Sequence, residues 1–220
     1  MGLKYFIALI IIAVGSYIYA SNKALTTLAI ILKPLATLLV ILIPLIYSKT
    51  QTKYKTHIIF GLIFCLIGDV LLLFNSMFIF GLIAFLIGHL IFIKGFILKE
   101  GFLVNYKSLA ILILYACGFF WFIKNDLGDL LIPVIFYMTC ILLMAWQGIN
   151  LFLSKSDYFS KLIIIAVCLF VLSDTILAIN KFKNTLPFAN ELIGITYWSA
   201  ITLIGLSTTH FTHRNARNRT

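Results

Sequence analysis

Four ionisable side chains inside the long apolar runs of this 220-residue sequence are the most informative: Lys33, Asp69, His89 and Asp174. An ionisable group near the centre of a membrane helix costs about 2.5–3.5 kcal/mol on insertion scales, so such groups point to function. Two carboxyl groups in one low-dielectric pocket can divide into a proton donor and an ionised partner. That division serves general acid–base catalysis and the stabilisation of cations. The same pair can instead relay protons in a transporter, and the residue pattern alone leaves both uses open.

The other polar side chains have structural interpretations beside the functional one. Lys33 can extend its ammonium group to the headgroups while its stem stays in lipid, or it can pair with an Asp or a phosphate. His89 can simply hydrogen-bond a neighbouring helix. Tyr197 and Trp198 can be ordinary packing aromatics. A short Asp side chain cannot reach the headgroups, so the two carboxyls are the hardest of these groups to explain structurally.

The composition predicts an all-α, polytopic transmembrane helix bundle. Hydrophobic residues make up 62% of the chain and charged residues 11%, against about 25% charged in soluble domains. A span needs roughly 20 residues, so eight spans with short loops use nearly the whole chain. We expect a single domain over residues 1–211 and a basic, polar cytoplasmic tail over residues 212–220. The expected spans are residues 3–20, 28–48, 57–74, 77–98, 107–123, 128–149, 161–180 and 191–211.

The basic residues predict the orientation of the spans. Eleven Lys and Arg residues fall on one side: Lys4, Lys49, Lys53, Lys55, Lys99, Lys107, Lys155, Lys161, Arg214, Arg217 and Arg219. Four fall on the other: Lys23, Lys124, Lys181 and Lys183. The positive-inside rule then places both termini in the cytoplasm and the protein in the cell (inner) membrane. The net charge of +10 is spread over the ends of the apolar runs, which argues against a nucleic-acid partner.

This topology gives the polar residues comparable depths. Lys33, Asp69, Asp174 and Tyr197 each lie about five or six residues from the outer end of an expected span, which corresponds to a depth of about 8–9 Å. His89 is deeper in its span. A shared layer predicts one polar cavity in the outer half of the bilayer.

Two further patterns bear on the organisation of the chain. The segment Ile67–Leu72 resembles Leu172–Leu177, and either a four-plus-four internal duplication or chance similarity between apolar segments explains this. The cysteines show no metal-binding spacing, and we expect all of them to be buried thiols that pack as small hydrophobes. They are Cys65, Cys117, Cys140 and Cys168.

Short polar motifs, taken in order, resemble the YhhN-type lysoplasmalogenase family over nearly the full chain. The matching stretches are Lys33-Pro34-Leu35, Gly68-Asp69 with Leu72, Gly88-His89, Ser173-Asp174-Thr175-Ile176-Leu177-Ala178 with Phe182, and Tyr197-Trp198. Two positions depart from the family pattern: Phe92 replaces a Tyr, and Ile201 replaces a Gln.

The resemblance implies hydrolysis of the vinyl ether of lysoplasmalogens, lysophospholipids of the membrane, to a fatty aldehyde and glycerophospho-ethanolamine or -choline. It implies catalytic roles for Asp69, Asp174 and His89, and no metal or other cofactor. We expect the substrate to be bound by Lys33, Ser173, Tyr197 and Asn180. Two alternatives stay open: a metal-dependent lipid hydrolase with His89 and the two Asp residues as ligands, and a proton-coupled transporter or lipid-binding protein. The oligomeric state does not follow from the sequence.

Overall fold

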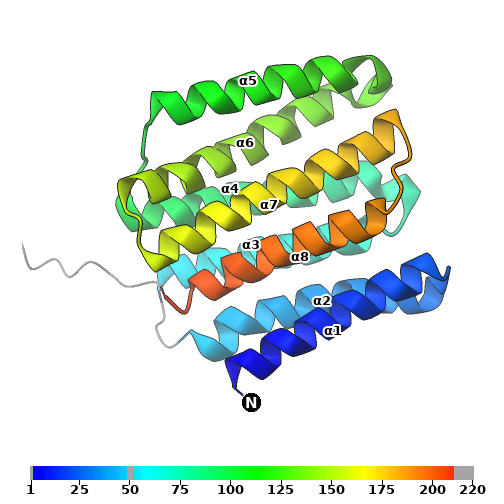
Figure 1. Cartoon of the computed structure of the whole chain (residues 1–220), viewed down its shortest axis with the longest axis horizontal. Helices are drawn as coiled ribbons and strands as arrows, with labels where there is room; N and C mark the ends of the chain where they lie inside the picture. Colours follow the sequence, from blue (N-terminus) through cyan, green and yellow to red (C-terminus); the bar gives the residue numbers. More distant parts are fainter. Residues whose placement is uncertain (1, 49–51, 211–220) are drawn as a thin grey trace, which may run out of the picture.

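Long helices that run side by side make up the protein in a computed structural model, which describes residues 2–48 and 52–210 (Figure 1). Within those residues there are eight α-helices and no strand. Their bounds are α1 (Leu3–Asn22), α2 (Thr26–Tyr47), α3 (Lys53–Leu71), α4 (Phe78–Glu100), α5 (Tyr106–Ile123), α6 (Leu131–Ser154), α7 (Tyr158–Ala178) and α8 (Ala189–Ser207). The short helical segments between them are η1 (Asn75–Met77), η2 (Lys124–Asp126), η3 (Gly128–Leu130) and η4 (Ile179–Lys183).

Seven of the described helices, α1 to α7, are long and apolar enough to cross a membrane, so the protein is a multi-pass membrane protein. The remaining long helix, α8, has 19 residues but carries more polar groups, among them Glu191 in its first turn. It nevertheless packs against α1, α2, α3 and α7 in the middle of the bundle. Its polarity is therefore directed at other helices, where neighbouring side chains can satisfy it.

Successive helices alternate in direction, which gives the bundle two distinct ends (Figure 1). The start of α1 and the end of α8 lie at one end, called here the terminal end. The turns after α1, α3, α5 and α7 lie at the other, called here the distal end. A hydrogen bond of 3.1 Å from Ser48 Oγ to the Thr208 carbonyl joins the ends of α2 and α8 at the terminal end. The predicted tail, residues 212–220, lies outside the described residues.

Several helix ends differ from the apolar runs that predicted them. Helix α3 begins at Lys53 rather than residue 57, because the Thr52 hydroxyl accepts a 3.1 Å hydrogen bond from the Lys55 backbone N–H and caps the helix. It also ends at Leu71 rather than residue 74, and α6 continues to Ser154 rather than 149. The apolar window marks the part of a helix suited to hydrocarbon, whereas caps and backbone hydrogen bonds set its full length.

Glycines bring α3 and α4 into close contact. The short Asn75–Met77 turn joins the two helices as an antiparallel pair. Gly61 on α3 leaves room for the Phe92 ring, which a methyl group there would overlap. A methyl group on Gly88 would lie 3.2 Å from the Gly61 carbonyl oxygen. Small residues permit this approach of two backbones, which is a common route to helix association in lipid.

The cysteines divide into two classes, which corrects the expectation that all four are buried. Cys65 and Cys140 are buried, whereas Cys117 on α5 and Cys168 on α7 are exposed on the outer surface of the bundle. Helices that are apolar all round do not reveal which face packs inward, and a thiol is tolerated equally in lipid and in a protein core.

Candidate functional site

A cavity of about 240 Å³ opens near the distal end of the bundle. Five of the seven predicted site residues line it: Lys33, Asp69, Ser173, Asp174 and Tyr197. The two remaining predicted residues, His89 and Asn180, do not line it. The segments Ile67–Leu72 and Leu172–Leu177 thus each contribute one cavity carboxyl, although an origin by duplication stays a prediction.

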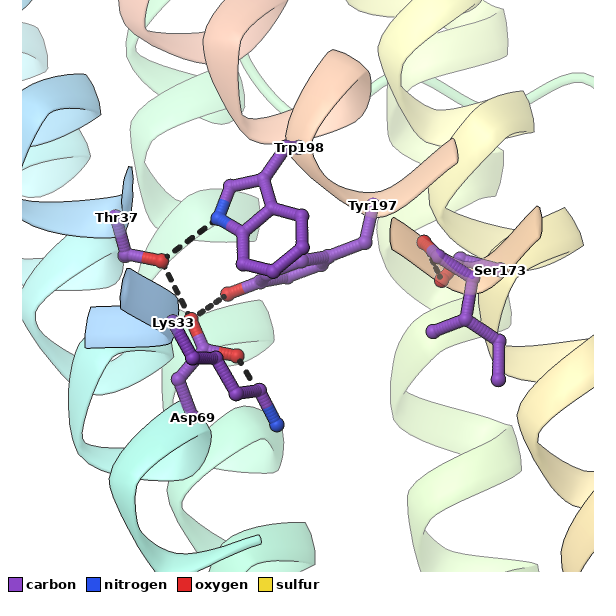
Figure 2. Close-up of polar contacts among 7 residues, drawn as sticks. Lys33, Thr37, Asp69, Ser173, Tyr197 and Trp198 are labelled. Carbon is purple, nitrogen blue, oxygen red and sulfur yellow. Dashed lines mark hydrogen bonds and ion pairs between the residues drawn. The ribbon is translucent and has the colours of Figure 1, made fainter. Parts of the chain in front are cut away.

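Asp69 is held by partners from α2 and α8 (Figure 2). The Thr37 hydroxyl donates to its Oδ2 at 2.6 Å, and the Tyr197 hydroxyl donates to the same oxygen at 2.8 Å. The Lys33 ammonium lies 3.9 Å from Oδ1. The residue is only 1% exposed, so these protein groups make up most of the polar surroundings of its carboxyl.

The sequence produces this arrangement through helical spacing. Lys33 and Thr37 are four residues apart on α2, so both project from one face toward α3. On α8 the Trp198 indole N–H donates to the Thr37 hydroxyl at 3.0 Å, which orients that hydroxyl toward Asp69. The Tyr197 ring makes edge contacts with Phe85 at 5.7 Å and Phe170 at 5.6 Å between ring centroids. Tyr197 and Trp198 are therefore more than packing aromatics, since both belong to the Asp69 network.

Asp174 has sparser surroundings. The Tyr137 hydroxyl of α6 donates a short hydrogen bond to its Oδ2. The side chain is partly exposed, and it lines both the cavity and an apolar groove beside it. The two carboxyls thus differ: Asp69 has two donors and an ammonium group, whereas the described contacts of Asp174 are limited to one phenol.

Two of the residues predicted to bind substrate make bonds that organise the backbone. The Ser173 hydroxyl donates to the Ile193 carbonyl of α8 at 3.3 Å, and in Figure 2 the side chain lies apart from the Asp69 cluster. Asn180 lies in the π-helical segment η4, and its Oδ1 accepts a 2.9 Å hydrogen bond from the Leu186 backbone N–H. The Ser173 bond joins α7 to α8, and the Asn180 bond holds the segment between these two helices at the edge of the cavity.

His89 is buried behind the cavity wall. Its ring packs on Phe170 at 4.8 Å and on Tyr137 at 5.4 Å between centroids, and neither ring nitrogen has a hydrogen-bond partner among the described residues. No group of three or more His, Cys, Asp and Glu side chains in residues 2–48 and 52–210 is placed to bind a metal ion. The ligand set of the metal-dependent alternative is therefore not assembled in that part of the chain.

Thr37, Tyr137 and Lys181 contribute to the site but are not among the residues predicted from the sequence. Thr37 had a readable signal, its spacing of four residues from Lys33. Tyr137 had none, because a tyrosine in an apolar run does not show which face it occupies. Lys181 falls between the expected spans 161–180 and 191–211, yet it lines the cavity. Phe92 and Ile201, the two departures from the family pattern, are fully buried and do not line it.

Comparison with known proteins agrees with the sequence motifs. Residues 28–208 match the YhhN family. The chain is 32% identical over 155 residues to Lysoplasmalogenase TMEM86B of Homo sapiens, which covers 69% of this chain and 63% of the relative. It is 27% identical over 157 residues to Lysoplasmalogenase TMEM86A of Bos taurus, covering 69% of this chain and 65% of the relative. The matched part thus spans less than two thirds of these relatives, and no solved structure matches.

Proposed function

Because the chain belongs to the YhhN family, we propose that it hydrolyses the vinyl ether bond of lysoplasmalogens within the membrane. The products are a fatty aldehyde and glycerophospho-ethanolamine or -choline. The relatives named lysoplasmalogenase support this substrate class. The observation that carries the proposal is that two carboxyl side chains, Asp69 and Asp174, line one cavity at the distal end.

The reaction needs a proton donor and a base, and no change of oxidation state. A carboxylic acid protonates the vinyl carbon distant from the ether oxygen, and the adjacent carbon becomes an oxocarbenium ion. Water adds to that carbon and gives up a proton to a carboxylate. The resulting hemiacetal loses the glycerol oxygen as an alcohol and leaves the aldehyde. Paired carboxylates stabilise a similar cation in glycosidases.

The surroundings of the two carboxyls suggest how these roles divide. Asp69 accepts hydrogen bonds from Thr37 and Tyr197 and faces an ammonium group, so it is suited to remain an anion and to stabilise the cation. Asp174 has one described donor and is open to both the cavity and the groove, so it is suited to deliver a proton to a bound lipid. We assign Asp174 as the acid and Asp69 as the fixed negative charge.

His89 has a supporting role in this scheme. It does not line the cavity, but its ring packs on Tyr137, whose hydroxyl donates to Asp174. It therefore acts on the carboxyl through the position of Tyr137. Ser173 supports the cavity by joining α7 to α8, and Asn180 supports it through the segment between them. Lys33 is placed to attract the lipid phosphate while it holds Asp69.

The proposal includes a topology. All eight long helices span the inner membrane, both termini are cytoplasmic, and the cavity opens to the outer half of the bilayer. The charge imbalance of the sequence supports this orientation. Residues 1–211 then form one membrane domain, and residues 212–220 a cytoplasmic tail.

The test uses purified protein in detergent with a lysoplasmalogen and its saturated alkyl-ether analogue. We expect aldehyde release from the vinyl ether alone, because the alkyl ether cannot form the cation by carbon protonation. In D2O, one solvent deuterium should appear at the α-carbon of the aldehyde. Absence of aldehyde with intact, folded protein would favour the transporter or lipid-binding alternative. Inactivation by EDTA that zinc restores would favour the metal-dependent alternative.

A further inference from the structure

The polar cavity continues directly into a narrow apolar groove between α4, α5, α6 and α7. The groove has a volume of about 60 Å³ and is lined almost entirely by apolar side chains. Its residues on α6 run from Val134 to Leu142, a rise of about 12 Å along the helix. Five residues line both the cavity and the groove: Phe78, Leu82, Tyr137, Asp174 and Leu177. Asp174 therefore stands at the junction of a polar and an apolar compartment.

The way α5 packs explains why this groove exists. Of the residues of α5, only Ser108 and Ile123 are buried, and they lie near its two ends. Ser108 donates to Asn150 Oδ1 of α6 at 2.8 Å, and Ile123 joins a small apolar cluster at the distal end. Between these ends, a hydrogen bond between the Tyr115 and Thr175 hydroxyls joins the middle of α5 to α7, and both residues line the groove. The middle of α5 contributes no fully buried residue, so the groove stays open beside α6 and α7 and gives an apolar chain lateral access from the bilayer.

The cavity carries cationic groups on the other side of Asp174. Lys33 lines it from α2, and Lys181 lines it from η4. The Lys181 ammonium lies 4.9 Å from the centre of the Phe78 ring, and the side chain is exposed. Lys183, on the same segment, instead pairs with Asp126 at 2.7 Å and does not line the cavity. Lys181 is thus the ammonium group of this segment that is available to an anion in the cavity.

We propose that a lysolipid binds with its phosphate at Lys33 and Lys181, its vinyl ether at Asp174, and the adjoining part of its hydrocarbon chain in the groove between α4, α5, α6 and α7. This inference rests on the proposed function and adds the binding path and the specificity role of Lys181. In the protein, the anion site is followed by the carboxyl of Asp174 and then by the apolar groove. In the substrate, the phosphate is followed by the vinyl ether and then by the hydrocarbon chain, so the two orders match. The groove receives only the first carbons of the chain, and the rest extends into the bilayer.

A second apolar groove offers a competing path for the chain. It lies between α1 and α8, has a volume of about 620 Å³, and includes Thr202. Of the cavity residues, it shares Trp198, whose indole N–H donates to Thr37. That ring stands between the second groove and Asp69, and Asp174 does not line it. Despite its larger volume, this groove lacks the direct connection to a carboxyl that the first one has.

The chain path is tested with Met138→Trp, which fills the groove beside α6, and Thr202→Trp, which fills the groove between α1 and α8. Substrates are a hexadecenyl and a butenyl vinyl ether of glycerophosphocholine, assayed with the full chain in detergent. We expect Met138→Trp to lower kcat/KM for the long chain at least tenfold relative to the short chain. Thr202→Trp should leave that ratio unchanged. The reverse pattern, or no change of the ratio in either variant, would overturn the chain assignment.

The phosphate site is tested with Lys181→Gln and the matched control Lys183→Gln. Each variant removes one positive charge from η4, but only Lys181 lines the cavity. We expect Lys181→Gln to raise KM about tenfold for the glycerophosphocholine substrate and to leave KM for an alkenyl glycerol, which has no phosphate, unchanged. Equal effects of the two variants, or equal effects on the two substrates, would overturn the assignment.

These outcomes are separable from failure of the proposed function. If the unchanged protein releases aldehyde from none of the three substrates, the hydrolase proposal fails. If it releases aldehyde while the ratios stay unaffected by Met138→Trp and Lys181→Gln, the hydrolase proposal stands and the binding path is wrong.

Discussion

Asp69 and Asp174 carry the same functional group in one cavity, and their neighbours set them apart. Thr37 and Tyr197 both donate to Asp69, while Asp174 receives a hydrogen bond from Tyr137. A carboxylate that accepts several hydrogen bonds beside a cation is held as an anion. A carboxyl at the edge of an apolar groove has fewer polar neighbours that stabilise its anionic form. The difference between donor and anion thus arises from residues on α2, α6 and α8.

Chemical rescue distinguishes the two roles. Asp69→Ala and Asp174→Ala should each lower aldehyde release by at least about 10²-fold, the range of positioned acid–base groups. Acetic acid should partly restore Asp174→Ala in proportion to its undissociated form, because the missing group is a proton donor. In Asp69→Ala the restored rate should follow the acetate anion instead. Rates are measured over a series of pH values at constant total acetate.

The control for this rescue is Asp129→Ala, which removes a carboxyl from the loop segment η3, away from the cavity. It should keep full activity and show no response to acetate. If the two cavity variants respond to the same form of acetate, the division of roles is wrong. If both keep full activity, the acid–base mechanism itself is wrong.

The charged site residues inside the expected spans were predictable from the sequence, whereas the contact made by Tyr137 was not. Asp69, Asp174 and Lys33 stand out because a charge in hydrocarbon is costly, whatever its exact neighbours. The phenol of Tyr137 costs little in an apolar run, so its contact with Asp174 depends on the rotation and packing of α6. His89 stands out for the same reason as the Asp residues, yet the packing of α4 turns it behind the wall of the cavity.

At the scale of the elements, the pairing of α3 with α4 fixes the position of Asp69. Gly61 and Gly68 on α3 are seven residues apart, and Gly81, Gly88 and Gly95 on α4 repeat the same interval. A seven-residue repeat keeps small residues on one side of each helix, so the two backbones stay close along their length. Asp69 directly follows Gly68 and is thereby presented to the cavity beside α4.

The Gly61–Phe92 contact predicts a strongly non-additive pair of substitutions. Gly61→Ala should destabilise the protein by about 1–3 kcal/mol, because the added methyl overlaps the Phe92 ring. Phe92→Ala should cost about 3–5 kcal/mol, because the ring is fully buried. In the double variant the added methyl no longer meets the ring, so the combined loss should be well below the sum. Thermal unfolding in detergent measures each variant.

A matched glycine on α5 serves as the control for this cycle. Gly118 has no atom within 4 Å of an added methyl, so Gly118→Ala should be neutral or slightly stabilising. Additive losses in the Gly61→Ala, Phe92→Ala double variant would contradict the close contact between α3 and α4. Additive losses would also mean that contact with Gly61 does not explain why this chain has Phe92 where the family pattern has a Tyr.

The start of α7 predicts a pH-dependent contribution to stability outside the membrane. Burial of Asp157 raises its pKa, but hydrogen bonds from Ser160 and the ammonium of Lys99 outweigh this and leave the pKa below its ordinary value. Its contribution to stability is therefore present above the unfolded pKa of about 3.9 and is lost as the pH falls through the lower folded value. Asp157→Ala should cost about 1 kcal/mol at pH 7, the usual value of a helix cap.

Thermal unfolding of the unchanged protein, Asp157→Ala and Asp157→Asn between pH 3 and pH 7 measures this contribution. Asn keeps the capping oxygen and loses the charge, so it should recover part of the loss at pH 7. The difference between the unchanged protein and Asp157→Asn should shrink below about pH 4. A difference that stays constant down to pH 3 would mean that the charge of Asp157 does not stabilise the helix start.

For the whole molecule, the sequence was sufficient for the helix count and order but not for the lateral arrangement. Each segment that crosses the lipid must satisfy its own backbone hydrogen bonds, so it forms a helix. Hydropathy therefore indicates how many such helices the chain has. It does not report that α5 flanks the bundle on one side and α1 and α2 on the other, with α8 in between (Figure 1). That arrangement depends on small residues and side-chain contacts, such as those between α3 and α4, which lie outside any single segment.

Helix α8 lies in the middle of the bundle but is more polar than the other long helices. Whether it crosses the membrane therefore decides between eight spans and seven. If α8 crosses the membrane with the other seven, both termini lie on the same side, since the described ends of α1 and α8 lie at one end of the bundle (Figure 1). The excess of Lys and Arg at that end predicts that this side is the cytoplasm. If α8 did not cross, the C-terminus would lie opposite the N-terminus.

Reporter fusions measure this directly, with an enzyme active only outside the cytoplasm and a fluorescent protein that folds only within it. We expect outside signals from fusions at Asn22, Ser76, Asn125 and Lys183, and inside signals from fusions at Thr52, Asn105, Ser156 and the C-terminus. The decisive pair is Lys183 and the C-terminus, because they bracket α8. Opposite signals from these two fusions require α8 to span the bilayer, which carries Tyr197 and Trp198 to the depth of Asp69. Equal signals would mean seven spans, and α8 could not then bring Tyr197 to Asp69 from within the membrane.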